Sequence, residues 1–216
     1  MISTIILDFD GVILESVSVK TEAFREIFSS EPNHLEEIID FHIRNGGMSR
    51  FDKFRHIYNV ILKEDLTQKK FEELSEKFSS IVFKKLIKAP FVPGAQEFLK
   101  TYHAKIPLYI VSATPEEELI QIIQKRELSH YFRKVFGAPQ KKSECISEII
   151  KITGYPPRSV IFVGDAKNDF DAAQVTGVRF IGRIEKEREN LFGGLTGIDT
   201  IIPDLWGLSR YIEVHQ

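Results

Sequence analysis

The hydrophobic pattern of this 216-residue chain changes period twice. Thr4 to Phe9 (TIILDF) is rich in β-branched and apolar residues and predicts a strand buried on both faces. From about residue 17 to 88, apolar residues recur at helical spacing, most clearly between Phe71 and Leu86. The pair Gly46-Gly47 interrupts this helical region. The pattern therefore predicts one strand followed by a long helical segment.

Strand and helix patterns alternate after residue 89, where a proline- and glycine-containing stretch (APFVPG) restarts the chain. The expected strands are residues 106–112, 134–138, 159–165 and 178–182, each of the first three followed by a helix. Such alternation predicts a parallel sheet with right-handed crossovers. The expected fold is α/β, a Rossmann-like three-layer αβα arrangement in which 1–15 and 89–216 form the core and 16–88 a helical insertion.

Composition and charge narrow the class of protein. Lys and Arg total 29 against 31 Asp and Glu, a formal net charge of -2, and no basic block indicates a nucleic-acid partner. The single cysteine, Cys145, excludes an intramolecular disulfide and is expected to be a buried helical residue rather than a catalytic thiol. The charged run Arg183 to Asn190 (RIEKEREN) predicts a solvated helix or loop face.

The beginning of the chain does not resemble a signal peptide, because it lacks a basic region and Asp8 and Asp10 interrupt the apolar run. No stretch approaches the ~18 apolar residues that a membrane span needs. We therefore expect a soluble, cytoplasmic protein without a membrane partner.

Polar residues end the predicted strands, and the carboxyl ends of parallel strands meet at one edge of a sheet. Asp8 and Asp10 end the first strand and Ser112 the second. Lys141 and Lys142 follow the third. The fourth strand leads to Asp165 and Asp169. Acids, a hydroxyl and an amine are thus expected to meet at this edge.

The acids predict a metal site. At strand period two, the side chains of Asp8 and Asp10 would point the same way, and with Asp165 and Asp169 they would crowd one place. Their repulsion calls for a cation, and an all-oxygen donor set favours Mg²⁺. The six histidines are scattered without the spacing of metal ligands.

The same edge suits a phosphoryl group, whose negative charge in transfer needs a hydroxyl, backbone N–H groups, a lysine and a metal around it. Ser112, the amides of Gly11 and Ala113, and Lys142 can fill these roles. A carboxylate nucleophile can then form an aspartyl-phosphate and divide hydrolysis into two easier steps.

These motifs resemble the haloacid dehalogenase-like superfamily. The aspartate-x-aspartate pair, the strand-end serine, the lysine after the third strand and the acidic GDAKND stretch occur in the expected order along the whole chain. The resemblance implies that Asp8 is the nucleophile and that Asp10 protonates the leaving oxygen and then activates water. It implies that Mg²⁺ is held by Asp8, the backbone carbonyl of Asp10, Asp165 and Asp169.

The resemblance also implies that Ser112 and a lysine grip the phosphate. Lys142 is preferred, because Ser143 and Glu144 after it resemble a helix start, and Lys141 stays an alternative. True dehalogenases that resemble this fold lack an acid at the position of Asp10, so the chain is expected to act on phosphate esters.

The helical insertion resembles the small cap that such enzymes close over their substrate. Within NGGMSR, Arg50 either reaches a phosphate or sugar oxygen or is a solvated helix-start residue. Lys20 and Lys53 are further candidates, although exposure is the favoured interpretation for both.

The expected function is a magnesium-dependent phosphatase of small phosphorylated metabolites. A phosphomutase of the beta-phosphoglucomutase type is the nearest alternative. A phosphonatase that uses Lys20 for a Schiff base and a non-catalytic phosphate-binding protein are less favoured. The cap would decide among the enzymes, and its sequence carries no signature that does so.

Overall fold

A six-stranded parallel sheet forms the centre of the computed structural model, which describes residues 1–46, 48–186 and 189–215. Its strand order is β3-β2-β1-β4-β5-β6. The strands are β1 (Thr4–Leu7), β2 (Leu108–Pro115), β3 (Lys134–Ala138), β4 (Val160–Gly164), β5 (Arg179–Arg183) and β6 (Thr200–Ile202). With β1 and β4 central, the first and fourth predicted strands end side by side.

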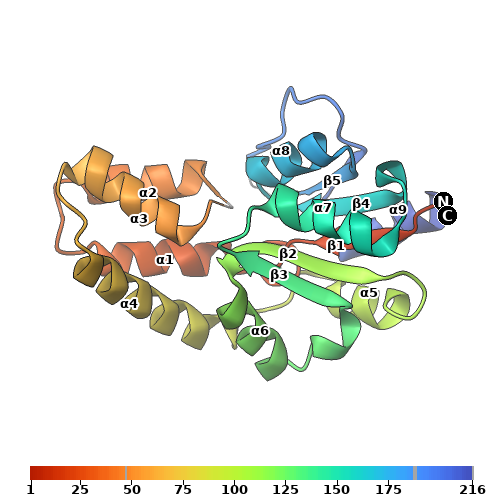
Figure 1. Cartoon of the computed structure of the whole chain (residues 1–216), viewed down its shortest axis with the longest axis horizontal. Coiled ribbons are helices and arrows are strands. Elements are labelled where there is room, and N and C mark those ends of the chain that lie inside the picture. Colours follow the sequence, from red (N-terminus) through yellow and green to blue (C-terminus); the bar gives the residue numbers. More distant parts are fainter. Residues whose placement is uncertain (47, 187–188, 216) are drawn as a thin grey trace.

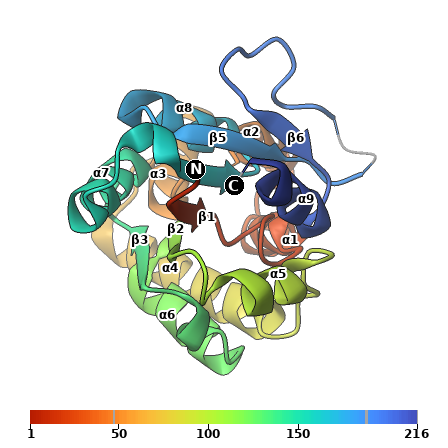
Figure 2. The same cartoon turned by 90° about the vertical axis from the view of Figure 1, so that its right-hand side faces the viewer.

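Helices cover both faces of the sheet, and the α/β fold class is confirmed. In Figures 1 and 2, α5, α6 and α9 lie on one side of the strands and α7 and α8 on the other. These helices are α5 (Ala95–Tyr102), α6 (Glu116–Lys125), α7 (Lys142–Thr153), α8 (Lys167–Thr176) and α9 (Leu205–His215). Single 3-10 turns span Ser129–Tyr131 and Pro157–Ser159.

The first strand is buried on both faces, as its sequence predicted. Ile5 and Leu7 pack into the apolar cluster on the side of α5, α6 and α9, whereas Ile6 packs into the cluster beneath α7 and α8. The strand ends at Leu7, two residues earlier than expected. Asp8 and Asp10 therefore lie beyond the regular strand, in the segment that leaves the sheet.

The helical unit beside the sheet consists of α1 (Val17–Ile27), α2 (Leu35–Arg44), α3 (Arg50–His56) and α4 (Gln68–Leu86), and α3 continues into a π-helix at Ile57–Leu62. Four aromatic rings hold it together. The ring centroid of Phe24 lies 5.7 Å from that of Phe54 and 5.1 Å from that of Phe78, and Phe28 stacks at 6.1 Å. The boundaries at 15/16 and 88/89 stay a prediction of domain structure.

Other expectations from the sequence concern a cysteine, a glycine and the last two elements of the chain. Cys145 is a buried residue of α7 and a free thiol whose pKa is raised by burial to about 12, which confirms the structural interpretation. Gly47 lies outside the described residues. The pattern did not predict β6 or α9.

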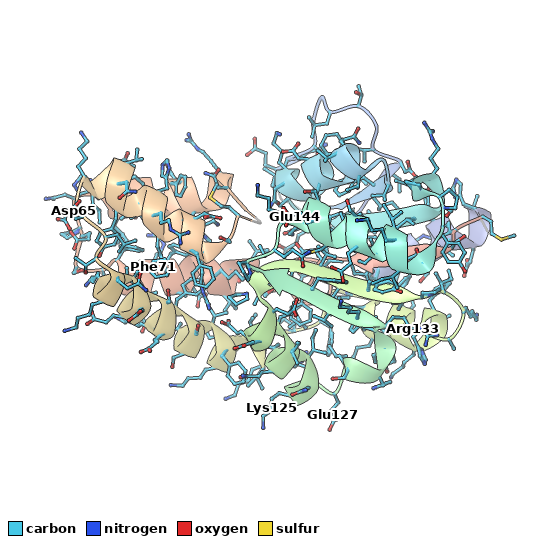
Figure 3. The ribbon with its side chains drawn as sticks, viewed as in Figure 1. Asp65, Phe71, Lys125, Glu127, Arg133 and Glu144 are labelled. Atoms are coloured by element: carbon cyan, nitrogen blue, oxygen red, sulfur yellow. The ribbon has the colours of Figure 1, made fainter. Side chains whose placement is uncertain are left out.

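Charged side chains cover the outside of the molecule, as Figure 3 shows for Lys125 and Glu127 at the end of α6. In the run 183–190, Glu185, Lys186 and Glu189 are exposed as predicted, and 187–188 lie outside the described residues. Arg183 is buried, which corrects the solvated interpretation at that position. Across the described residues, no helix combines the length and apolarity that crossing a membrane would require.

Candidate active site

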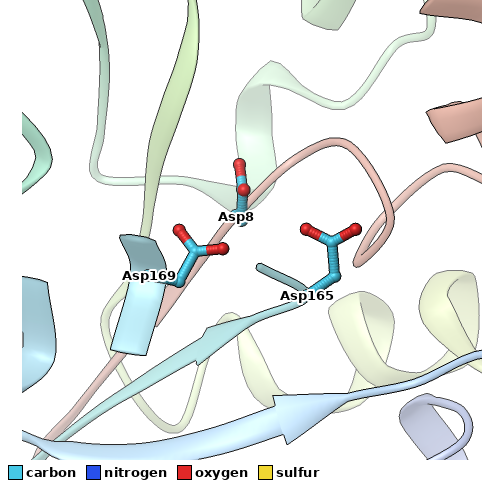
Figure 4. A group of neighbouring side chains, drawn as sticks. All are labelled: Asp8, Asp165 and Asp169. Atoms are coloured by element: carbon cyan, nitrogen blue, oxygen red, sulfur yellow. The ribbon is translucent and has the colours of Figure 1, made fainter. Parts of the chain in front are cut away.

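Three carboxylates converge at the carboxyl ends of β1 and β4 (Figure 4). Asp8 follows β1, Asp165 follows β4, and Asp169 lies in the first turn of α8. One oxygen from each lies within 4.8 Å of the others. The structure therefore brings Asp8, Asp165 and Asp169 together at this edge, as the sequence predicted.

Two glycines give these carboxylates room. A Cβ at Gly11, where φ is +73°, would lie 2.1 Å from Oδ2 of Asp165. A Cβ at Gly164 would lie 2.3 Å from the Cβ of Asp169. Both distances are far below van der Waals contact, so the acidic group can form only with glycine at these positions.

Lys142, at the start of α7, joins two of the acids. Its Nζ donates to Oδ2 of Asp8 at 2.7 Å and to Oδ1 of Asp169 at 2.5 Å. Burial lowers the pKa of the Lys142 ammonium, but the Asp169 and Asp8 carboxylates outweigh burial and raise the pKa above its ordinary value. Lys141 is exposed, so of the two candidate lysines only Lys142 reaches the acidic group.

The acidic group carries more negative charge than Lys142 neutralises. Burial, with the Asp8 and Asp169 charges, raises the pKa of Asp165 well above its ordinary value. Burial, with a contribution from Asp8, raises the pKa of Asp169 to about 6. Two buried carboxylates, Asp8 and Asp169, and the half-buried carboxylate of Asp165 form an all-oxygen donor set that suits a hard divalent cation.

The carboxylate of Asp10 lies in a different environment, and the expectation that it faces the same group as Asp8 is wrong. Its Oδ1 accepts from Oγ of Ser16 at 2.6 Å. Its Oδ2 accepts from Nζ of Lys20 at 2.5 Å and from Oγ1 of Thr114 at 2.9 Å. The period-two argument fails because β1 ends at Leu7.

The charge of Asp10 is compensated by these three donors. Burial raises the pKa of Asp10, but the Lys20 ammonium and the hydrogen bonds from Lys20, Ser16 and Thr114 outweigh it and hold the pKa below its ordinary value. Ser16 and Thr114 were not among the sequence candidates. The position of Thr114, a polar residue just after the expected strand, could have identified it. Nothing in the sequence identifies Ser16.

The phosphate-binding candidates of the sequence lie at the end of β2 and after β1. Ser112 is buried in β2, and its Oγ accepts the amide of Thr114 at 3.2 Å. Ala113 lines the cavity between the sheet and the helical unit. The amide of Gly11 donates to the carbonyl of Leu14 at 2.8 Å, so its expected role as an anion donor is corrected. Gly11 provides space for Asp165 instead.

Three cations of the helical unit surround the same cavity, and the interpretation of them as exposed or solvated is wrong. Lys20 bonds Asp10 and also donates to Oγ1 of Thr114 at 3.1 Å. Arg50 is the first residue of α3, but its side chain is buried and donates to Oε2 of Glu118 in α6 at 2.7 Å. Lys53 is buried as well.

Arg183, at the end of β5, fixes the segment that carries Asp10. Its guanidinium donates to the carbonyl of Gly11 at 3.2 Å and to both carboxylate oxygens of Glu15, at 2.9 and 2.5 Å. It also donates to the carbonyl of Pro203 at 3.0 Å. The sequence places Arg183 in a charged run, which hid this buried role.

Comparison with known proteins agrees with this geometry. The family model described as haloacid dehalogenase-like hydrolase matches residues 5–183. Because that match covers most of the chain, the protein belongs to the haloacid dehalogenase-like hydrolases, and the resemblance seen in the sequence is confirmed.

Individual relatives give a finer comparison. Phosphoglycolate phosphatase 1 of Pseudomonas aeruginosa is 25% identical over 184 residues, which cover 81% of this chain and 66% of that protein. The chain thus spans about two thirds of that relative's length. A phosphorylated carbohydrates phosphatase of Thermotoga maritima is 28% identical over 184 residues, with 82% of each chain covered.

A solved structure of beta-phosphoglucomutase from Clostridium difficile superimposes with a TM-score of 0.76. The identity is 18%, and the match covers 99% of this chain and 96% of that one. At this identity the likeness concerns the fold.

Proposed function

We propose that this protein is a magnesium-dependent phosphatase that hydrolyses small phosphate monoesters through an aspartyl-phosphate on Asp8. The observation that carries the proposal is the pairing of the buried Asp8 carboxylate with Lys142 beside two further acids. The two phosphatases compared above support it.

The Asp8, Asp165 and Asp169 carboxylates, together with the backbone carbonyl of Asp10, would hold the metal. Bound Mg²⁺ would offset the negative charge of these acids and of the substrate phosphate. The raised pKa values of Asp165 and Asp169 support this assignment, because they reflect charge that the described residues leave without full compensation.

In the first step, an oxygen of Asp8 attacks phosphorus, a bond from Asp8 to phosphorus forms, and the ester oxygen leaves with its electron pair. In the second step, water attacks phosphorus, the bond to Asp8 breaks, and inorganic phosphate is released. Lys142, through its ion pair with Asp8, would orient the Asp8 carboxylate for attack. Ser112 and the backbone near Ala113 would bind the phosphate oxygens.

Asp10 would donate a proton to the leaving oxygen and later take one from the attacking water. Its lowered pKa keeps it ionised in the resting enzyme. To act as an acid it must first gain a proton from solvent, which a weaker contact with Lys20 would favour. Lys20 lies on α1, so movement of the helical unit would change the protonation of Asp10.

The helical unit would act as a cap that admits and encloses the substrate. The cavity between it and the sheet has a volume of about 30 Å³, enough for about one water molecule. The closed cavity is small for a phosphate ester, so the unit would move away from the sheet to admit the substrate. Arg50 is the proposed contact to the substrate from this unit.

The test is release of phosphate from p-nitrophenyl phosphate and from a panel of small phosphate esters, with and without Mg²⁺. Asp8→Asn should lower the rate by about 10³-fold or more. Asp171→Asn, at an exposed position of α8, should leave the rate unchanged. Equal rates with Asp8→Asn, or without any divalent metal, would contradict the proposal.

The same assay distinguishes a phosphomutase. Glucose 1-phosphate with a bisphosphate primer should yield free phosphate. Conversion to the isomeric sugar phosphate without phosphate release would replace the hydrolase assignment with a transferase.

A further inference from the structure

Glu118 of α6 is bonded to two different helices of the helical unit. Its Oε2 accepts from Nη2 of Arg50 in α3 at 2.7 Å and from Oγ of Ser79 in α4 at 3.0 Å. The side chains of Arg50 and Glu118 are 9% and 11% exposed, so solvent screens their ion pair little. Because α6 packs on the sheet, one carboxylate joins the two parts of the molecule. We call these two bonds the closing contact.

Each part of the molecule holds its half of the closing contact in place. The guanidinium carbon of Arg50 lies 5.2 Å from the ring centroid of Phe51 and 5.3 Å from that of Phe78. Ser79 follows Phe78 directly in α4. On the other side, Glu118 lies in the first turn of α6. The closing contact can therefore break and form again without rearrangement inside either part.

The ion pair of the closing contact is incomplete. Nε of Arg50 and Oε1 of Glu118 are buried, and neither has a hydrogen-bond partner among the described residues. A buried ion pair recovers the cost of desolvation only when its remaining donors and acceptors are bonded as well. The closing contact therefore gains less than a complete ion pair would. This balance suits a contact that has to open.

A second contact between α4 and α6 is of a different kind, and the two helices lie side by side in Figures 1 and 2. Nη1 of Arg126, just after α6, donates at 3.3, 2.8 and 2.7 Å to the carbonyls of Leu86, Ile87 and Ala89. The carbonyls at a helix end have no partner within the helix, so Arg126 caps α4. Ser79 lies ~10 Å along α4 from this cap. The helical unit can thus part from the sheet at Glu118 and stay attached at Arg126.

We infer that Glu118 is a positioning residue that holds the helical unit against the sheet in the closed arrangement. The inference rests on the cap movement in the proposed function and adds the residue that sets the balance between closed and open molecules. Without its carboxylate, Arg50 would be buried without an anion, and opening would return that cation to water. Glu118 would act through the position of the helical unit and not on the reacting atoms.

A distance measurement tests the inference without catalysis. Spin labels on Ile43→Cys in α2 and Val175→Cys in α8, both exposed, report on the separation of the two parts. The native Cys145 is buried, which leaves the introduced cysteines as the labelling sites. The protein with native Glu118 should show mainly one short distance. A distribution dominated by a long distance would overturn the inference.

Glu118→Gln should raise the ratio of long to short distances by about 10-fold, because the buried Arg50 loses its anion. Glu117→Gln is the matched control, since Glu117 lies in the same turn of α6 and is exposed. It should leave the ratio unchanged. Equal ratios in the two variants would overturn the inference.

Further variants separate the closing contact from a general loss of stability. Ser79→Ala should raise the ratio less than Glu118→Gln, and Ser80→Ala, at an exposed position, should leave it unchanged. Arg50→Met combined with Glu118→Met leaves no charge buried alone, so its ratio should be below that of Glu118→Gln. If Glu118→Gln does not fold, Ser79→Ala against Ser80→Ala decides. A double variant as open as Glu118→Gln would contradict the pairing.

Kinetics with p-nitrophenyl phosphate give a second readout. In Glu118→Gln, KM should rise by up to the same factor as the ratio of distances while kcat changes less, because fewer molecules are closed before the substrate binds. An unchanged KM would contradict the inference. Phosphate release with equal distances in Glu118→Gln and Glu117→Gln would overturn only the role of Glu118. Changed distances without phosphate release from any compound would overturn the phosphatase proposal and support the closing contact.

Discussion

Asp8 and Asp10 are two residues apart and have opposite electrostatic surroundings. Asp8 faces Lys142 and two other acids, where a metal suits the charge. Asp10 faces Lys20 and two hydroxyls, which compensate it without a metal. This separation fits one carboxylate that attacks and another that exchanges protons.

Gly11 offers a test at the scale of one residue. Gly11→Ala should abolish metal-dependent activity, because the added Cβ would lie 2.1 Å from Oδ2 of Asp165. Gly154→Ala is the matched control, since Gly154 has a similar φ of +69° and nothing within 4 Å of an added Cβ. Each substitution should lower the free energy of unfolding by about 1 kcal/mol, because alanine is strained in the left-handed backbone conformation.

The measurements are chemical denaturation and phosphate release. Only Gly11→Ala should also lose activity and show weakened Mg²⁺ binding. If the two variants behave alike, the close approach of Gly11 and Asp165 does not limit the site.

At the scale of elements, hydrogen bonds from one side chain of β5 connect that strand to the segment after β1. Arg183 donates to the Gly11 carbonyl and to Glu15, and so holds the segment between Asp10 and α1. A fixed segment keeps the Asp10 carboxylate near Thr114, and would continue to do so if the helical unit moves as proposed. We therefore regard Arg183 as a positioning residue.

Arg183→Met should destabilise the protein by about 3 kcal/mol, because it leaves Glu15 and the Gly11 carbonyl without their buried donor. Arg179→Met is the control from the same strand. Its ion pair with Asp199 is partly exposed, and its loss should cost no more than about 1 kcal/mol.

Urea denaturation measures both values, and kcat with p-nitrophenyl phosphate reports on Asp10. In Arg183→Met, kcat should fall more than KM rises. Equal losses of stability in the two variants would contradict the proposal that Arg183 is a positioning residue.

At the scale of the whole molecule, metal binding links stability to pH. The carboxyl of Asp169 has a pKa raised to about 6, so below that pH a proton competes with the metal. In the metal-free protein this raised pKa means that stability is lost as pH rises from the ordinary value of 3.8 through about 6. A bound cation offsets that loss, so its effect is greatest above pH 6.

Thermal unfolding with Mg²⁺ or with a chelator measures this effect. The increase in Tm produced by Mg²⁺ should be larger at pH 7.5 than at pH 5.5. Asp165→Asn should remove most of the increase, and Asp171→Asn should keep it. An increase that is independent of pH and persists in Asp165→Asn would place the metal elsewhere.

The sequence by itself determined the α/β class, the family and the acids at the sheet edge. Strand and helix periods are local, and residues that end parallel strands must meet, so Asp8, Asp165 and Asp169 could be placed together before any coordinates. Lys142 was likewise preferred over Lys141 from the helix start that follows it.

Only the tertiary structure decided which partner each charge has. Asp10 was grouped with Asp8 because strand alternation was extended past Leu7, and Lys53 and Arg183 were expected in solvent because burial of a cation cannot be read from its neighbours in sequence. Ion pairs such as Arg50 with Glu118 join residues far apart in the chain. Their formation depends on how the helical unit packs against the sheet, which no local pattern encodes.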